Sequence, residues 1–140
     1  ILTINSADIG QLIISNEEEL ITLNSNFEQA WAENLGPISA VSSGIYVDEK
    51  PTIWVGINDG SKGLLKVLFQ EGGKLVSAMN CGKITSINSN GRMVAVGDEE
   101  GELFVWQDEM FNRRLVSDEP DENDERRQSM RERLKALRGR

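Results

Sequence analysis

The hexapeptide Ile1-Leu-Thr-Ile-Asn-Ser6 returns almost unchanged as Ile84-Thr-Ser-Ile-Asn-Ser89, with a looser copy, Ile38-Ser-Ala-Val-Ser-Ser43, between them. Each string is followed by an apolar run that closes on a small residue, and these small residues recur every 41 positions, at Ser15, Gly56 and Gly97. From the first unit to the third, the hexapeptide shifts by 83 residues and the small residue by 82, which indicates an internal repeat with a period of about 41 residues.

Two further runs complete each unit. In the three units, the third run lies at residues 18–24, 63–69 and 101–107. A weaker fourth run lies at 30–33, 75–77 and Leu115-Val-Ser117. Turn formers such as Asn58-Asp-Gly60 and Asn90-Gly91 separate runs rich in Val, Ile, Leu and Trp, a pattern typical of antiparallel meanders. The sequence therefore predicts three four-stranded units, at about 1–35, 36–80 and 81–117, and no helix signal is seen before residue 120.

One of these runs resembles a known repeat family. Gly101-Glu-Leu-Phe-Val-Trp-Gln107 resembles the end of a WD40 repeat, where a glycine turn precedes an apolar strand closing in Trp-Asp, and Gly63-Leu-Leu-Lys-Val-Leu-Phe69 is similar to a degenerate copy. Gln107 replaces the usual aspartate, and without histidine the Gly-His dipeptide of that family is missing. The period and the resemblance predict an all-β fold of three four-stranded antiparallel β-propeller blades. A β-sandwich of about a dozen strands is the alternative.

Three blades do not close a ring, because propellers contain roughly four to eight. Two apolar blade faces would stay open. Ile1 already lies inside an expected strand, and no methionine precedes it. We therefore expect the C-terminal part of a larger ring, seven-bladed by resemblance, whose remaining blades lie upstream or come from another chain; a six-bladed ring of two copies is the alternative.

Composition excludes several classes of function. The 140 residues contain no histidine and one cysteine, Cys81, which excludes histidine-dependent triads and multi-cysteine metal clusters and fits a reducing, intracellular compartment, cytoplasmic or nuclear. The net charge of −8 lies entirely in residues 1–116, which disfavours nucleic acid binding by that part. No apolar run approaches the roughly 18 residues of a membrane span. We expect no enzyme activity and no cofactor.

Charged turns supply the candidate binding site. In such meanders, the turns between the second and third strands lie at the same end as the connections to the next unit. These turns predict a protein-binding rim, suited to a basic peptide, formed by Glu17, Glu18, Glu19, Asp59, Lys62, Asp98, Glu99 and Glu100. Neither acidic cluster has the spacing of an EF-hand calcium loop. Trp54 and Trp106 are expected to pack between units, and Trp31 to be an exposed anchor.

The last residues differ in composition. An acidic linker is expected at 118–125 and a basic tail at 126–140. Met130, Leu134 and Leu137 would form one apolar stripe on a short C-terminal α-helix that binds a partner. Arg126-Arg-Gln-Ser129 resembles a basophilic kinase motif, which makes Ser129 a candidate phosphorylation site.

The sequence thus predicts a non-enzymatic scaffold that displays protein-binding surfaces in a multiprotein complex. Two other classes stay open. One is a subunit that reaches nucleic acid through the basic tail, and the other is a quinoprotein-type catalytic propeller, disfavoured because its cofactor ligands are missing.

Overall fold

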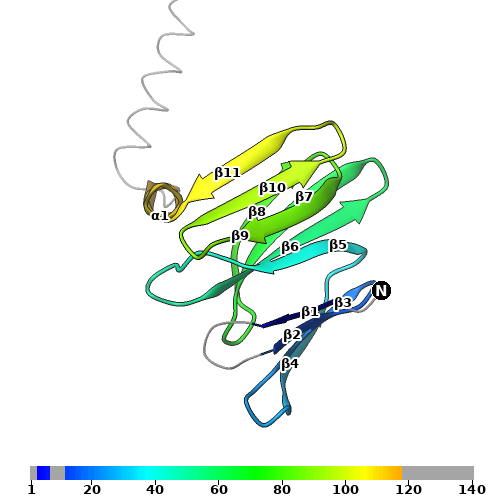
Figure 1. The fold of residues 1–140 in the computed structure, drawn as a ribbon, viewed down its shortest axis with the longest axis vertical. Helices are drawn as coiled ribbons and strands as arrows, with labels where there is room; N and C mark the ends of the chain where they lie inside the picture. The colour runs from blue at the N-terminus through cyan, green and yellow to red at the C-terminus, as the bar shows by residue number, and fades with distance from the viewer. Residues whose placement is uncertain (1–2, 7–11, 118–140) are drawn as a thin grey trace, which may run out of the picture. The chain divides into compact units, whose positions relative to one another are not determined.

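The computed structural model describes residues 3–6 and 12–117 of the chain. In this part, eleven strands precede one helix (Figure 1). Their bounds are β1 (Thr3–Ser6), β2 (Leu12–Ser15), β3 (Glu19–Leu23), β4 (Gln29–Asn34), β5 (Ile38–Ser43), β6 (Thr52–Asp59), β7 (Lys62–Phe69), β8 (Leu75–Cys81), β9 (Ile84–Ser89), β10 (Met93–Asp98), β11 (Leu103–Gln107) and α1 (Asp108–Ser117).

The strands form three antiparallel sheets whose order in space follows the chain: β1-β2-β3-β4, β5-β6-β7-β8 and β9-β10-β11. We call them the first, second and third sheets. The prediction of β-meanders is confirmed, and the strings 38–43 and 84–89 are β5 and β9 as expected. The described residues form three sheets rather than the two of a sandwich.

The third sheet corrects one prediction, because it has three strands in the described part of the chain rather than four. The run Leu115-Val-Ser117 is the end of α1, not a strand, and the expectation of no helix before residue 120 was wrong. Asp108 and Glu109 begin this helix and Arg114 lies in its last turn. This order of charges suits the helix dipole.

Turn chemistry explains the hairpins. β6 and β7 are paired up to Asp59 and Lys62, so only two residues connect them, and the first, Gly60, has a φ of 61°. Between β9 and β10, Gly91 has a φ of 89°. Glycine adopts these left-handed conformations without the steric cost that a Cβ atom imposes.

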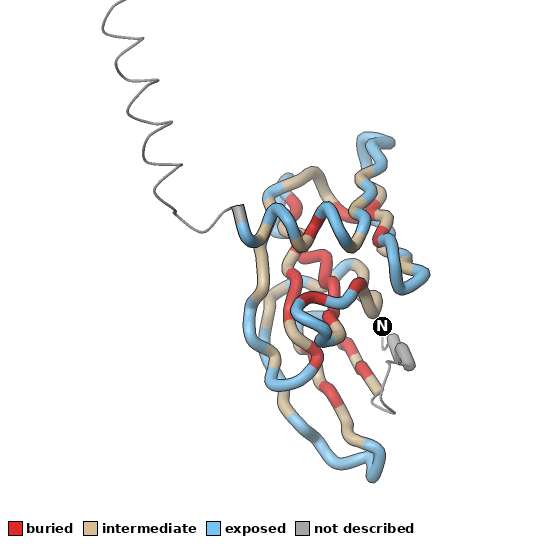
Figure 2. Tube along the Cα trace, turned by 90° about the vertical axis from the view of Figure 1, so that its left-hand side faces the viewer, coloured by how far each residue is buried: buried red, intermediate tan, exposed pale blue. Residues whose placement is uncertain are grey.

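Burial identifies the second sheet as the middle layer of the stack. Every residue from Thr52 to Ile57 in β6 is buried, whereas β2 and β10 alternate between buried and less buried residues. Figure 2 shows the buried segments gathered inside the stacked strands, with exposed turns around them. A strand buried on both sides must be covered by a layer on each face.

Each face of β6 has its own neighbours. Ile53, Val55 and Ile57 share a hydrophobic cluster with Ile13 and Leu20 of the first sheet. On the opposite face, the Trp54 ring lies 5.3 Å from that of Trp106 in β11, at an interplanar angle of 53°. Such tilted ring pairs are a favourable aromatic geometry. The expected packing of these two tryptophans between units is confirmed.

The first strands of the three sheets lie next to one another. β5 contacts both β1 and β9, and each of these strands is an edge strand of its own sheet. The sheets therefore converge along their first strands.

Candidate interaction surfaces

The turns between second and third strands and the connections between sheets meet at one end, as predicted. The amides of Leu35 and Ile38, in and after the first connection, donate hydrogen bonds to the carbonyls of Glu18 (2.9 Å) and Glu17 (2.8 Å). In the third sheet, the Glu99 amide donates to the carbonyl of Lys83, in the second connection, at 2.9 Å. These turns are fixed by backbone contacts.

The Asn58 side chain extends this network from the second sheet to the third. Its Nδ2 donates to the carbonyl of Ile84 (3.1 Å), and its Oδ1 accepts from the Ile84 amide (2.9 Å). Sequence reasoning assigned Asn58 to a turn and missed this contact. The only sequence signal for this contact was the residue type, because the amide side chain of asparagine has both a hydrogen-bond donor and an acceptor, as a peptide group has.

The candidate rim residues differ in exposure. Glu17, Glu18, Asp59, Lys62, Glu99 and Glu100 are exposed, and Glu19 is half-buried at the start of β3. Asp98 is buried, which corrects its expected place on an exposed surface. Its Oδ1 accepts hydrogen bonds from the amides of Glu100 (3.0 Å) and Glu102 (2.9 Å), so its side chain caps the turn from inside.

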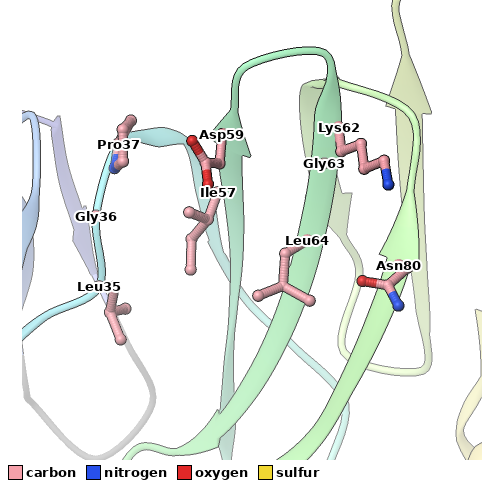
Figure 3. Close-up of a pocket in the computed structure, with 9 residues that line it drawn as sticks. All are labelled: Leu35, Gly36, Pro37, Ile57, Asp59, Lys62, Gly63, Leu64 and Asn80. Atoms are coloured by element: carbon pink, nitrogen blue, oxygen red, sulfur yellow. The ribbon is translucent and has the colours of Figure 1, made fainter.

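A groove lies beside Asp59 and Lys62. It has a volume of about 490 Å³ and is lined by Leu35, Gly36, Pro37, Ile57, Asp59, Lys62, Gly63, Leu64 and Asn80. Figure 3 shows the two charged residues at the ends of β6 and β7, with Ile57 and Leu64 further along the same strands. An apolar wall with one cation and one anion at its end suits an amphipathic segment of a partner.

The outer face of the third sheet is open and carries three large apolar side chains beside the exposed polar residues Ser86, Asn88 and Gln107. Met93 is 43% exposed, Val105 is 55% exposed and Leu103 is 68% exposed. The register pairs Leu103 with Gly97 and Val105 with Ala95, which places these residues on one face. The opposite face carries Val94 and Trp106, which are paired across the same strands. β11 is therefore apolar on both faces, but only one is covered within the described residues.

Trp31 is not the exposed anchor that the sequence suggested. Its Nε1 donates a hydrogen bond to the Gln70 carbonyl at 2.8 Å, and its ring packs close to Gly73. Trp31 belongs to β4 and Gly73 to the β7–β8 turn, so this side chain joins the first sheet to the second. The residue is half-buried.

A carboxylate cluster and one cysteine are the groups at this end of the fold with the potential to take part in chemistry. Asp98, Glu100 and Glu102 each offer a carboxylate oxygen, and these three oxygens lie within 4.8 Å of one another. The sequence comparison with calcium loops missed this cluster because it stopped at Glu100. Burial, followed by the negative charge of Asp98, raises the pKa of the Cys81 thiol, which is opposite to the activation that a nucleophile needs.

The predictions for the tail concern residues 118–140, which lie outside the described residues. They concern the linker 118–125, the stripe Met130, Leu134 and Leu137, the phosphorylation candidate Ser129 and the basic segment 126–140, and they stay predictions. In the part of the chain that the structure describes, no helix has the length and apolar character needed to cross a membrane.

Comparison with known proteins gives a similarity of fold. No protein-family model matches the chain, and no curated protein matches it. Among solved structures, it is similar to the computationally designed Ika4 protein, with 16% identity and a TM-score of 0.58 over 76% of this chain and 65% of that one.

Two further solved structures give lower scores. A protein of unknown function from Bacteroides caccae has 12% identity and a TM-score of 0.45, over 74% of this chain and 44% of that one. BamB from Moraxella catarrhalis has 13% identity and a TM-score of 0.34, over 75% and 42%. The chain thus spans from 42% to 65% of the length of these structures.

Proposed function

We propose that the chain is a non-enzymatic protein-interaction scaffold of the WD40-like propeller type, and that its open sheet face is covered by a further sheet of the same kind. That sheet comes from the remaining blades of the ring, upstream or in another chain. The observation that carries the proposal is the exposed apolar patch that Met93, Leu103 and Val105 form on the outer face of the third sheet.

The arrangement of the three sheets supports a propeller. Each sheet is a meander, and β5 contacts β1 on one side and β9 on the other. Blades of a propeller are arranged in this way, with first strands at the centre and flat faces packed on neighbours. The second sheet has a neighbour on each face, and the third has one within the described residues. A repeating unit at the end of such a stack needs a cap or another unit.

The energetic argument follows from exposure. Complete burial of a leucine or valine side chain stabilises by about 1.5–3 kcal/mol. Leu103 and Val105 are more than half exposed, so burying them in an association would release a large part of this stabilising free energy. In the described part of the chain β11 is also an edge strand of its sheet, a position that favours pairing with another strand.

Sedimentation velocity of the 140-residue chain tests this proposal. We expect concentration-dependent association, since the isolated chain has only its own copies to cover the open face. Leu103→Lys together with Val105→Lys should weaken the association at least tenfold, because two charges would be buried. The matched control is Leu75→Lys, which changes a leucine 51% exposed in β8. A stable, folded monomer at all concentrations would refute the proposal.

The turn end provides a second surface for a partner. Glu17, Glu18, Glu99 and Glu100 are exposed on turns held by backbone hydrogen bonds, so little conformational entropy is lost when a basic peptide binds. A synthetic peptide of residues 126–140 is a suitable basic probe. The affinity of this peptide for the chain at low salt should be lower in the Glu18→Lys, Glu99→Lys double variant. An unchanged affinity would mean that these glutamates contribute only to solubility.

A further inference from the structure

The turn between β10 and β11 gathers three carboxylates. Asp98 ends β10, and Glu100 and Glu102 precede β11, so the acids alternate along the turn. One oxygen from each lies within 4.8 Å of the other two. In a calcium site with Ca–O distances of about 2.3–2.6 Å, oxygens on opposite sides of the ion are roughly 4.6–5.2 Å apart. The three oxygens therefore fit around one calcium ion.

Burial of Asp98 gives a second, independent observation. The side chain is 7% exposed, and its Oδ2 is buried with no hydrogen-bond partner in the described part of the chain. Neither Glu100 nor Glu102 has a side-chain partner there either. A buried carboxylate oxygen without a donor is costly, and such a group in a folded protein calls for an ion or another ligand.

The corresponding turn of the first sheet shows which side chain is sufficient to accept the backbone amides of such a turn. Asn16 follows β2 and accepts the amides of Glu18 (3.0 Å) and Glu19 (2.7 Å) on its Oδ1. Asn90 caps the β9–β10 turn in the same manner, through Arg92 and Met93. A neutral amide is sufficient for these caps. The charge of Asp98 and its second oxygen are therefore not explained by the turn.

We infer that Asp98, Glu100 and Glu102 form a site for a divalent cation, and that the cation is Ca²⁺. Oxygen ligands from three carboxylates match a hard cation, with water completing the coordination shell. Two of the three acids are exposed glutamates, so we expect an affinity at the weak end of the range for calcium sites, with Kd roughly 0.1–1 mM. The ion would fix the β10–β11 turn at the end where the other turns lie.

Calorimetric titration and thermal unfolding of the full chain test the site, with NaCl added to equalise ionic strength. We expect one Ca²⁺ per chain and a rise in Tm of about 4–8 °C at 10 mM CaCl₂, since a ligand that binds only the folded state stabilises it. In the Asp98→Asn variant the amide keeps the cap, as Asn16 shows, but the charge is lost. This variant should fold without Ca²⁺ and bind it at least tenfold more weakly.

Two further variants separate the site from other carboxylates. Glu102→Gln removes an exposed ligand and should weaken binding in the same way, whereas Glu17→Gln with Glu18→Gln, in the turn of the first sheet, should leave it unchanged. The inference is overturned if CaCl₂ produces no more stabilisation than NaCl, or if the response persists in both Asp98→Asn and Glu102→Gln. An equal response to MgCl₂ would overturn the choice of calcium.

Discussion

The side chain of Asn58 holds the backbone of Ile84 through both of its polar atoms. Nδ2 donates to the Ile84 carbonyl at 3.1 Å, and Oδ1 accepts from the Ile84 amide at 2.9 Å. Ile84 is the first residue of β9 and is 1% exposed. A single amide thereby takes the place of a strand partner at the point where the third sheet begins beside the second.

Replacing Asn58 with aspartate should destabilise the fold by about 1–3 kcal/mol, because the partly buried carbonyl of Ile84 loses its donor and faces a negative charge instead. Equilibrium unfolding in urea measures this loss. Asn80→Asp, at an exposed position in β8, is the matched control and should change stability by less than about 0.5 kcal/mol. Equal effects of the two substitutions would contradict the role of the Asn58 contact.

Trp31 joins the first sheet to the second, and Trp31→Phe should cost about 1–2 kcal/mol. The phenyl ring retains much of the packing near Gly73 but cannot donate to the Gln70 carbonyl. Trp106→Phe is a suitable control, since it keeps an aromatic ring against Trp54, where the interaction is ring packing. Urea unfolding followed by far-UV circular dichroism compares them. A smaller loss for Trp31→Phe than for Trp106→Phe would be inconsistent with this hydrogen bond.

Local patterns explain why most strands could be predicted from the sequence. Alternating apolar residues and a turn such as Asn58-Asp-Gly60 act within a few residues, so their repetition every 41 positions was visible without coordinates. The helix α1 was missed because its three-residue end, Leu115-Val-Ser117, is too short to distinguish strand from helix, and its acidic start received no weight.

Contacts between sheets explain what could not be predicted. Asn58 and Ile84 are 26 residues apart, and Trp31 and Gln70 are 39 apart. Their pairing depends on how one sheet lies against another. The burial of Asp98 has the same origin, because its Oδ2 lies where a side chain on Gly82, in the second connection, would meet it. Sequence alone showed an acidic turn and could not show which acid points inward.

Gly63 lies at a close approach of two backbones, and Gly63→Ala should destabilise the fold by about 2–3 kcal/mol or more. An added Cβ would collide with the carbonyl oxygen of Gly82, which is backbone and cannot rotate away. At Gly97 the nearest atom to an added Cβ is the Ser86 hydroxyl, at 3.0 Å, which can change its rotamer. Gly97→Ala should therefore cost less than half as much in thermal unfolding. The reverse order would contradict the predicted contact.

Cys81 should react slowly with alkylating reagents. Burial is the main cause that raises the pKa of its thiol, and the charge of Asp98 adds to it, while a backbone hydrogen bond at Leu65 acts in the opposite direction. A thiol with a raised pKa holds its proton more tightly in the folded than in the unfolded chain. This contribution to stability is complete below the ordinary pKa of about 8.5 and is lost as the pH rises through the raised value.

The pH profile of iodoacetamide modification measures this shift, in a buffer free of divalent cations. At pH 8 the folded chain should react several-fold more slowly than the chain in urea, because the thiolate is the reactive form. The rate should still increase above pH 9. Asp98→Asn removes the repulsion from the carboxylate and should move the profile to lower pH, whereas Glu99→Gln, on the exposed side of the turn, should not. If Asp98→Asn leaves the profile in place, burial alone raises the pKa and the contribution of Asp98 is wrong.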